Sequence, residues 1–228
     1  MTELWDAIVE AVRLIVSLDP EVMEIARRSL AISATSCTIA ILICLPLGSL
    51  IHFRRFPGKK LLISVIQTLF SLPTVTVGII VFVLFRRVGP LGELGLLHTP
   101  VVMVIGQAML ITPVMLGLII SALSGVDRAV SETATSLGAS RFQMMVVTVR
   151  EARYAIMTAV IMGFGRAISE VGLSMMIGGN IAGFTRTITT AMLLETSRGD
   201  IELAMALGII LILIALVINV ALNRLQQK

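Results

Sequence analysis

The chain has 228 residues, of which 57% are hydrophobic and 14% are charged, and its mean hydropathy is +1.00. A soluble domain of this length exposes far more charge, so the composition excludes most soluble enzymes and is typical of a membrane protein. The net charge of +4 is not concentrated on a polar domain, because the basic residues stand at the ends of apolar runs. We therefore predict an all-α membrane protein with one domain, residues 1–228, and no nucleic-acid partner.

Residues 3–18 form the first predicted element, an amphipathic helix. Its apolar residues share one helical face, and its charged residues lie largely off that face. At about 15 residues it is too short to span a bilayer, which needs about 20 apolar residues. We predict an interfacial helix that ends at Asp19-Pro20, with a short, tilted sixth span as the alternative.

Five apolar runs follow, and each is long enough to cross the membrane. We predict spans at about 29–51, 61–85, 100–124, 154–178 and 203–222; only the fourth contains charged residues, Arg166 and Glu170. Pro46, Pro73 and Pro113 fall within the first three spans and should bend them, because proline removes a backbone donor. Gln67 and Gln107, polar residues in the second and third spans, are expected to join helices by hydrogen bonds, with a lining of the path as the alternative.

The distribution of Lys and Arg predicts the orientation of these spans. Residues 52–60, 127–153 and the tail after Leu222 lie on one side and carry ten Lys and Arg. The segments on the other side carry seven, together with ten of the fourteen acids. The positive-inside rule places the first side in the cytoplasm. The prediction is a multi-pass protein of the cell membrane with its N-terminus outside and its C-terminus in the cytoplasm.

The segment 127–141 lies on that cytoplasmic side and reads as two short helices. Asp127 or Ser131 can cap the first helix, and Gly138 suits the left-handed conformation at its end. A second helix is expected to start near Arg141 and to lead into the next span. A rigid element of this type can transmit force from a soluble partner to the membrane helices.

The same segment resembles the coupling-helix signature of ABC importer permeases, in which Glu-Ala-Ala is followed by three intervening residues and then Gly. It appears here as Glu132, Thr133, Ala134 and Gly138, followed by Ala139 and Ser140. The resemblance implies that these six residues couple the chain to an ATPase. The later Leu-Pro of the pattern is replaced by Arg150-Glu151, so we expect the second helix to run unbroken toward Tyr154.

Residues 165–172, 178–181 and 185–187 resemble the oxyanion branch of this family, which comprises molybdate, tungstate and sulfate permeases. The Arg-Ala-Ile-Ser-Glu-Val-Gly stretch that begins at Arg166 and the Asp-Pro-Glu at Asp19 are most similar to the tungstate type. The resemblance implies the type I importer fold and inward transport of tungstate or molybdate by alternating access. It also implies a homodimer, two cytoplasmic ATP-binding subunits and an extracytoplasmic solute-binding protein.

Six residues are candidates for the anion pathway. Arg166 and Glu170 are four residues apart, so on one helix they would pair, either as a gate or as a structural brace. Asn180, Thr185, Arg186 and Thr187 lie on the outer side. Their donors suit an oxyanion at the outer mouth or a docking surface, and a solvated loop is the alternative.

Several other chemistries are excluded by the sequence. No phosphate-binding Gly-x-x-x-x-Gly-Lys-Ser/Thr loop occurs, so the chain is not predicted to be an enzyme, and a partner must hydrolyse ATP. His52 and His98 lie in distant loops, and we predict no metal site and no cofactor. The competing function is a secondary transporter for a small anion. It would need intramembrane coupling acids, and only Glu170 qualifies.

Overall fold

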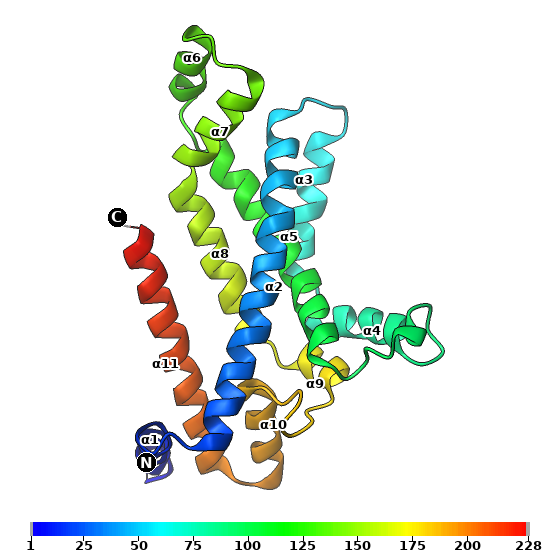
Figure 1. The fold of residues 1–228 in the computed structure, drawn as a ribbon, viewed down its shortest axis with the longest axis vertical. Coiled ribbons are helices and arrows are strands. Elements are labelled where there is room, and N and C mark those ends of the chain that lie inside the picture. The colour runs from blue at the N-terminus through cyan, green and yellow to red at the C-terminus, as the bar shows by residue number, and fades with distance from the viewer. Residues whose placement is uncertain (1, 227–228) are drawn as a thin grey trace.

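The computed structural model describes residues 2–226, and these form helices joined by loops (Figure 1). Residues 1 and 227–228, at the ends of the predicted domain, lie outside the described residues. The elements are α1 (Thr2–Val16), α2 (Pro20–Phe53), α3 (Lys59–Thr68), η1 (Leu69–Ser71), α4 (Thr74–Phe85), η2 (Gly92–Leu94), α5 (Pro100–Ser124), α6 (Arg128–Ser136), α7 (Arg141–Glu151), α8 (Arg153–Ile168), α9 (Gly172–Gly178), α10 (Ile188–Arg198) and α11 (Ile201–Gln226). The predicted all-α class is confirmed for this part of the chain.

Three of these helices, α2, α5 and α11, are long and apolar enough to cross a membrane. Asp19 caps the N-terminus of α2, because its Oδ1 accepts hydrogen bonds from the amides of Glu21 and Val22, and Pro20 takes the first helical position. Helices α2 and α5 continue through Pro46 and Pro113. The described part of the chain has up to five spans, if each of two bent helix pairs counts as one.

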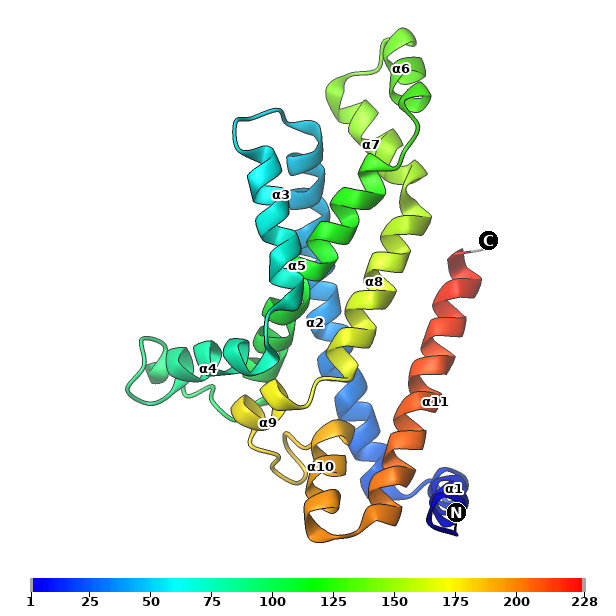
Figure 2. The same cartoon turned by 180° about the vertical axis from the view of Figure 1, so that it is seen from behind.

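The predicted span 61–85 is not one straight helix. It breaks at Leu72 and Pro73, and the two halves, α3 with η1 and α4, meet at an angle of 95°. Pro73 has no amide hydrogen to continue the helix, and its ring forces Leu72 out of the helical region, to a ψ of 125°. Helix α4 therefore leaves the bundle sideways, as both ribbon views show (Figures 1 and 2).

The predicted span 154–178 is also broken, although it contains no proline. Helices α8 and α9 meet at 59°, and residues 169–171 lie between them. The Glu170 carboxylate accepts a hydrogen bond of 2.9 Å from the amide of Leu173, and so caps the first turn of α9. Because α8 ends at Ile168, Arg166 and Glu170 do not share a helix face, and the predicted pair is absent from the ion pairs of the described residues.

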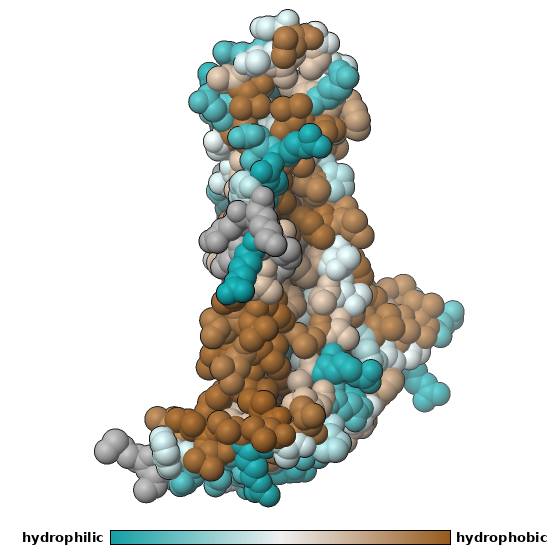
Figure 3. All heavy atoms as spheres, turned by 60° about the vertical axis from the view of Figure 1, so that its left-hand side comes forward, coloured by the Kyte–Doolittle hydropathy of each residue, from teal (hydrophilic) through white to brown (hydrophobic). Residues whose placement is uncertain are grey.

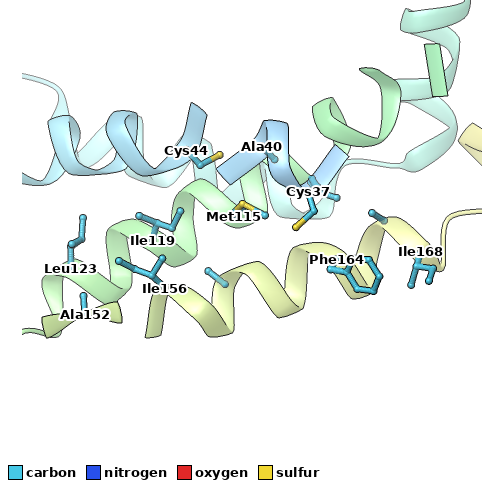
Figure 4. Close-up of a cluster of buried hydrophobic side chains, with 13 residues drawn as sticks. Cys37, Ala40, Cys44, Met115, Ile119, Leu123, Ala152, Ile156, Phe164 and Ile168 are labelled. Carbon is cyan, nitrogen blue, oxygen red and sulfur yellow. The ribbon is translucent and has the colours of Figure 1, made fainter. Parts of the chain in front are cut away.

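The central core lies where α2, α5 and α8 meet (Figure 4). Ser36, Ala40, Cys44 and Gly48 recur every four residues along α2, so they form one small-sided face against α5. A Cβ added to Gly48 would lie 2.9 Å from Ile119 Cγ2, which shows how closely the two helices approach. As predicted, Gln107 joins helices: its Oε1 accepts a hydrogen bond of 3.2 Å from Ser36 on α2. Gln67, for which the same was expected, is exposed on α3.

Helix α1 runs across the direction of α2 and α11, and it is seen end-on in Figure 1. Ala7 and Ala11 are buried where α1 packs on α11. The larger α1 side chains Trp5 and Val16 are 66% and 76% exposed. Hydrophobic residues cover the face of the molecule on which α11 lies (Figure 3). This arrangement suits the predicted interfacial helix, whose membrane position stays a prediction.

Candidate functional site

Helix α6 and the turn after it lie at the end of the molecule farthest from α1 (Figure 1). Of the two residues predicted to cap α6, Asp127 is the one that does so: its Oδ1 accepts a hydrogen bond of 2.9 Å from the amide of Ala129. Gly138 ends the segment with a φ of 79°. The amide of Gly138 donates to the Thr135 carbonyl, and the amide of Ala139 donates to the Ala134 carbonyl. These two hydrogen bonds form a Schellman motif.

Helix α7 starts at Arg141, and a capping box fixes its first turn. The amide of Gln143 donates to Ser140 Oγ, and the amide of Ser140 donates to Gln143 Oε1. The helix ends at Glu151, and a one-residue break at Ala152 separates it from α8, so the expected unbroken helix toward Tyr154 is wrong. Ala152 is buried in the central core, where α8 docks, whereas α7 packs mainly against α6 and reaches that core through Val149.

The six predicted coupling residues lie on different sides of this two-helix element. Thr133, Ala134, Gly138 and Ala139 line an open groove of about 780 Å³, together with Leu137, which is 83% exposed. Ser140 serves as the cap of α7. Glu132 instead lines a second cavity of about 550 Å³ between α6 and the end of α2. The basic lining residues of that second cavity include Arg55, Lys59 and Arg128.

Two of the predicted outer-side residues, Thr185 and Thr187, are buried and bound to the protein itself, whereas residues 181–184 beside them are exposed. Thr185 is fully buried; its hydroxyl donates to the Gly178 carbonyl at 2.6 Å and accepts from the amide of Ile181 at 3.0 Å. Thr187 is buried and caps α10 through a hydrogen-bonded box with Thr190. These two hydroxyls are therefore engaged in structural hydrogen bonds.

Arg186 and Asn180 lie near these threonines in the chain. Arg186 pairs with Glu21 at 3.3 Å, and its carbonyl accepts a hydrogen bond of 3.0 Å from Arg28 on α2. Arg28 also pairs with Glu24. The Asn180 backbone is left-handed, with a φ of 49°, and its Oδ1 is buried without a hydrogen-bond partner. Through its contacts with Glu21 and Arg28, Arg186 therefore connects the start of α10 to the start of α2.

Arg166 and Glu170 differ in their surroundings. Glu170 is 4% exposed and is held at the break between α8 and α9. Arg166 is partly exposed in the last turn of α8. Sequence reasoning missed that Thr158 and Met162, on the same side of α8, are exposed as well. Their spacing of four residues was the available signal, but it does not tell a buried face from an open one.

The chain matches a known protein family and several named relatives. The family described as "Binding-protein-dependent transport system inner membrane component" matches residues 44–228. The tungstate uptake system permease protein TupB of Peptoclostridium acidaminophilum is 39% identical over 218 residues, which cover 96% of each chain. The probable anion ABC transporter permease protein of Haloferax volcanii is 38% identical, with 88% of each chain covered. The molybdenum transport system permease protein ModB of Escherichia coli K12 is 30% identical, over 88% of this chain and 95% of its own.

Solved structures share the fold at lower identity. An inward-facing form of the MetNI methionine ABC transporter superposes with a TM-score of 0.73 at 19% identity, over 94% of this chain and 97% of that one. A bacterial alginate ABC transporter in complex with its alginate-pentasaccharide-bound periplasmic protein gives a TM-score of 0.72 at 19% identity, over 92% and 81%. These two likenesses concern the arrangement of the helices.

Proposed function

Because the chain belongs to the family of binding-protein-dependent transport system inner membrane components, we propose that it is the membrane permease subunit of an ATP-driven oxyanion importer. The observation that carries the mechanism is the capped two-helix element α6–α7, which stands at the end of the bundle with an open groove along it. ATP hydrolysis is supplied by a partner, since the chain contains no phosphate-binding loop.

The groove of α6 is the surface proposed to meet the ATP-binding subunit. Its lining of Ala134, Leu137 and Val147 is largely apolar and suits a protein contact. The Schellman motif at Gly138 and the capping box at Ser140 fix the angle between α6 and α7. Movement of a subunit docked there would pass along α7 to α8, which is separated from α7 by Ala152 alone.

The proposed substrate is tungstate or molybdate. The relatives with 39% and 34% identity are named tungstate uptake permeases, and ModB, at 30%, is a molybdenum transport permease. Both oxyanions are tetrahedral dianions that only accept hydrogen bonds, so the path needs donors and few acids. The buried acid Glu170 caps α9, and a secondary transporter would need a free coupling acid there.

The proposed assembly has two copies of this chain, two cytoplasmic ATP-binding subunits and an extracytoplasmic solute-binding protein. The ends of the molecule agree with the orientation set by its charges: α6 and residues 54–58 lie at one end, and α1 and α10 lie at the other (Figure 1). The first end is the proposed cytoplasmic side. The N-terminus is then outside the cell, and the C-terminus faces the cytoplasm.

Purification from the native membrane, followed by reconstitution, tests this function. We expect an ATP-hydrolysing subunit to co-purify and the complex to take up tungstate or molybdate when ATP and the binding protein are present. Glu132→Lys should abolish uptake while the chain still inserts and dimerises. Absence of an ATPase together with normal uptake by Glu132→Lys would overturn the proposal. Titration of the binding protein with tungstate, molybdate and sulfate identifies the substrate.

A further inference from the structure

Two arginines follow the end of α2, and local hydrogen bonds fix the backbone that carries them. Arg54 is the C-cap of α2, and its amide donates a hydrogen bond of 3.1 Å to the carbonyl of Leu50. The ammonium of Lys59 closes the loop that follows, because it donates to the carbonyls of His52 at 2.6 Å and Arg54 at 3.3 Å. The end of α2 is therefore held in place, and both Arg54 and Arg55 are exposed.

A groove of about 790 Å³ lies between this end of α2 and the start of α7. Helix α7 stands at the height of the last turns of α2 in both ribbon views (Figures 1 and 2). We call it the arginine groove, because Arg141 on α7 lines it together with Arg54 and Arg55. The rest of its lining is mainly apolar and includes Leu50, Phe53 and Phe142.

The positive charge of the arginine groove is not neutralised within the chain. No acid is found among the described residues that line it. Arg55 also lines the neighbouring cavity that contains Glu132, but none of the three arginines belongs to the ion pairs observed within residues 2–226. Three guanidiniums side by side without an acid favour a bound anion, since like charges repel one another.

The arginine groove lies where the apolar surface of α2 ends. Four exposed aliphatic residues of α2 recur every three or four positions and so share one helical face: Ile39, Ile43, Leu47 and Leu50. Arg54 follows Leu50 by four residues, so this face leads directly to the guanidiniums. Phe142 is 68% exposed on the α7 side. Exposed apolar side chains next to basic ones are typical of the boundary between lipid tails and headgroups.

The two halves of the arginine groove together select a class of ligand. A guanidinium binds a phosphate through two parallel N–H bonds, which a carboxylate or a phosphate can accept. A free oxyanion would meet the arginines and leave the apolar half of the groove in contact with water. An anionic phospholipid matches both halves, because its phosphate meets the arginines while its acyl chains lie on the aliphatic face of α2.

We propose that the arginine groove binds the headgroup phosphate of an anionic glycerophospholipid, with the acyl chains along Ile43 and Leu47. The bound lipid contacts the end of α2 and the start of α7 at once. It therefore gives the α6–α7 element a second support, since α7 packs mainly against α6. The proposal goes beyond the proposed function and does not depend on which solute the chain transports.

Lipid titration of the purified permease complex, followed by native mass spectrometry, tests the headgroup. Phosphatidylglycerol and phosphatidylcholine with identical chains are compared. The variant Arg54→Gln/Arg55→Gln is matched by Arg86→Gln/Arg87→Gln, because Arg86 and Arg87 are also an exposed pair that begins at a helix C-cap, that of α4. We expect the wild type to prefer phosphatidylglycerol. The groove variant should bind it about fivefold more weakly for each arginine removed, and the control pair should match the wild type.

Two outcomes of this titration overturn the proposal. One is equal affinity of the wild type for the two lipids, a result that depends on no variant. The other is an equal loss of phosphatidylglycerol affinity in the groove variant and in the control variant. All four substituted arginines are exposed, so both variants are expected to fold.

A second comparison separates a lipid from a free oxyanion. Inorganic phosphate and tungstate, each in large excess, should leave the bound phosphatidylglycerol in place, because they cannot use the apolar half of the groove. Phe142→Ala should weaken lipid binding, whereas Phe184→Ala, at an exposed phenylalanine of the opposite end, should not. Displacement of the lipid by either anion, or unchanged lipid binding by Phe142→Ala, assigns the arginine groove to a free anion and overturns the proposal.

Discussion

The hydroxyl of Thr189 donates a hydrogen bond of 2.9 Å to the carbonyl of Glu170. Both residues are buried, and the bond joins the first turn of α10 to the break between α8 and α9, nineteen residues earlier. The carbonyl of Glu170 lies between α8 and α9, outside both helices. Helix α10 thus helps to set the shape of the break between α8 and α9.

Thr189→Val should weaken that connection. The variant keeps the volume of the side chain but leaves the Glu170 carbonyl without this donor, so we expect the free energy of unfolding to fall by about 1 kcal/mol. Thermal unfolding of the purified permease in detergent measures the loss. Thr196→Val, on the exposed side of α10, is the control and should change little. Equal stability of the two variants would contradict the role of the bond.

Glu170 allows the cap of α9 to be separated from its charge. Glu170→Gln keeps an oxygen that can accept from the amide of Leu173, whereas Glu170→Ala removes it. We expect the alanine variant to lose about 1 kcal/mol of stability, a typical value for a lost cap, and the glutamine variant to lose less. Thermal unfolding of the two purified variants under the same conditions measures this difference in stability. A glutamine variant as unstable as alanine would mean that the negative charge itself stabilises the fold.

Gly117 marks the close contact between α5 and the turn before Pro73. A Cβ at Gly117 would lie 2.4 Å from Phe70 Cζ, so Gly117→Ala should cost about 1–3 kcal/mol through overpacking, less the gain in helix propensity. Gly165→Ala meets no atom within 4 Å and should not lower the stability. Combination with Phe70→Leu should restore much of the loss. Additive losses in the double variant would show that the strain lies elsewhere.

Gly138 provides a test of the proposed coupling element α6–α7 that leaves the membrane helices untouched. A Cβ there meets nothing within 4 Å, so the cost of Gly138→Val comes from its φ of 79°, about 1–2 kcal/mol. We expect ATP-driven uptake to fall about fivefold or more, since about 1 kcal/mol shifts a population by that factor. Gly138→Asn, which tolerates the left-handed conformation, should retain more uptake. Uptake that is the same in both variants would contradict a role for the turn angle.

Local patterns in the sequence were enough to predict the helical class, the start of α7, and the N-cap and terminal glycine of α6. Asp127, Gly138 and Ser140 act on amides within a few residues of themselves, so their roles can be inferred without the fold. The resemblance to ABC importer permeases is likewise confirmed by the family match at residues 44–228. The run 100–124 coincides with α5, because it contains no charged residue and the helix continues through Pro113.

Only the tertiary structure decided where the second and fourth apolar runs break and which polar residues are buried. Pro73 marks a break in the sequence, but the angle of 95° is set by the packing of α4 on α9 and α5. The break at Glu170 contains no proline and is bridged by the hydrogen bond from Thr189. The predicted pair with Arg166 does not form, because α8 ends between the two residues. Burial of Thr185 and exposure of Thr158 are set by contacts between segments that are distant in the sequence. The periodicity of a single helix cannot predict these contacts.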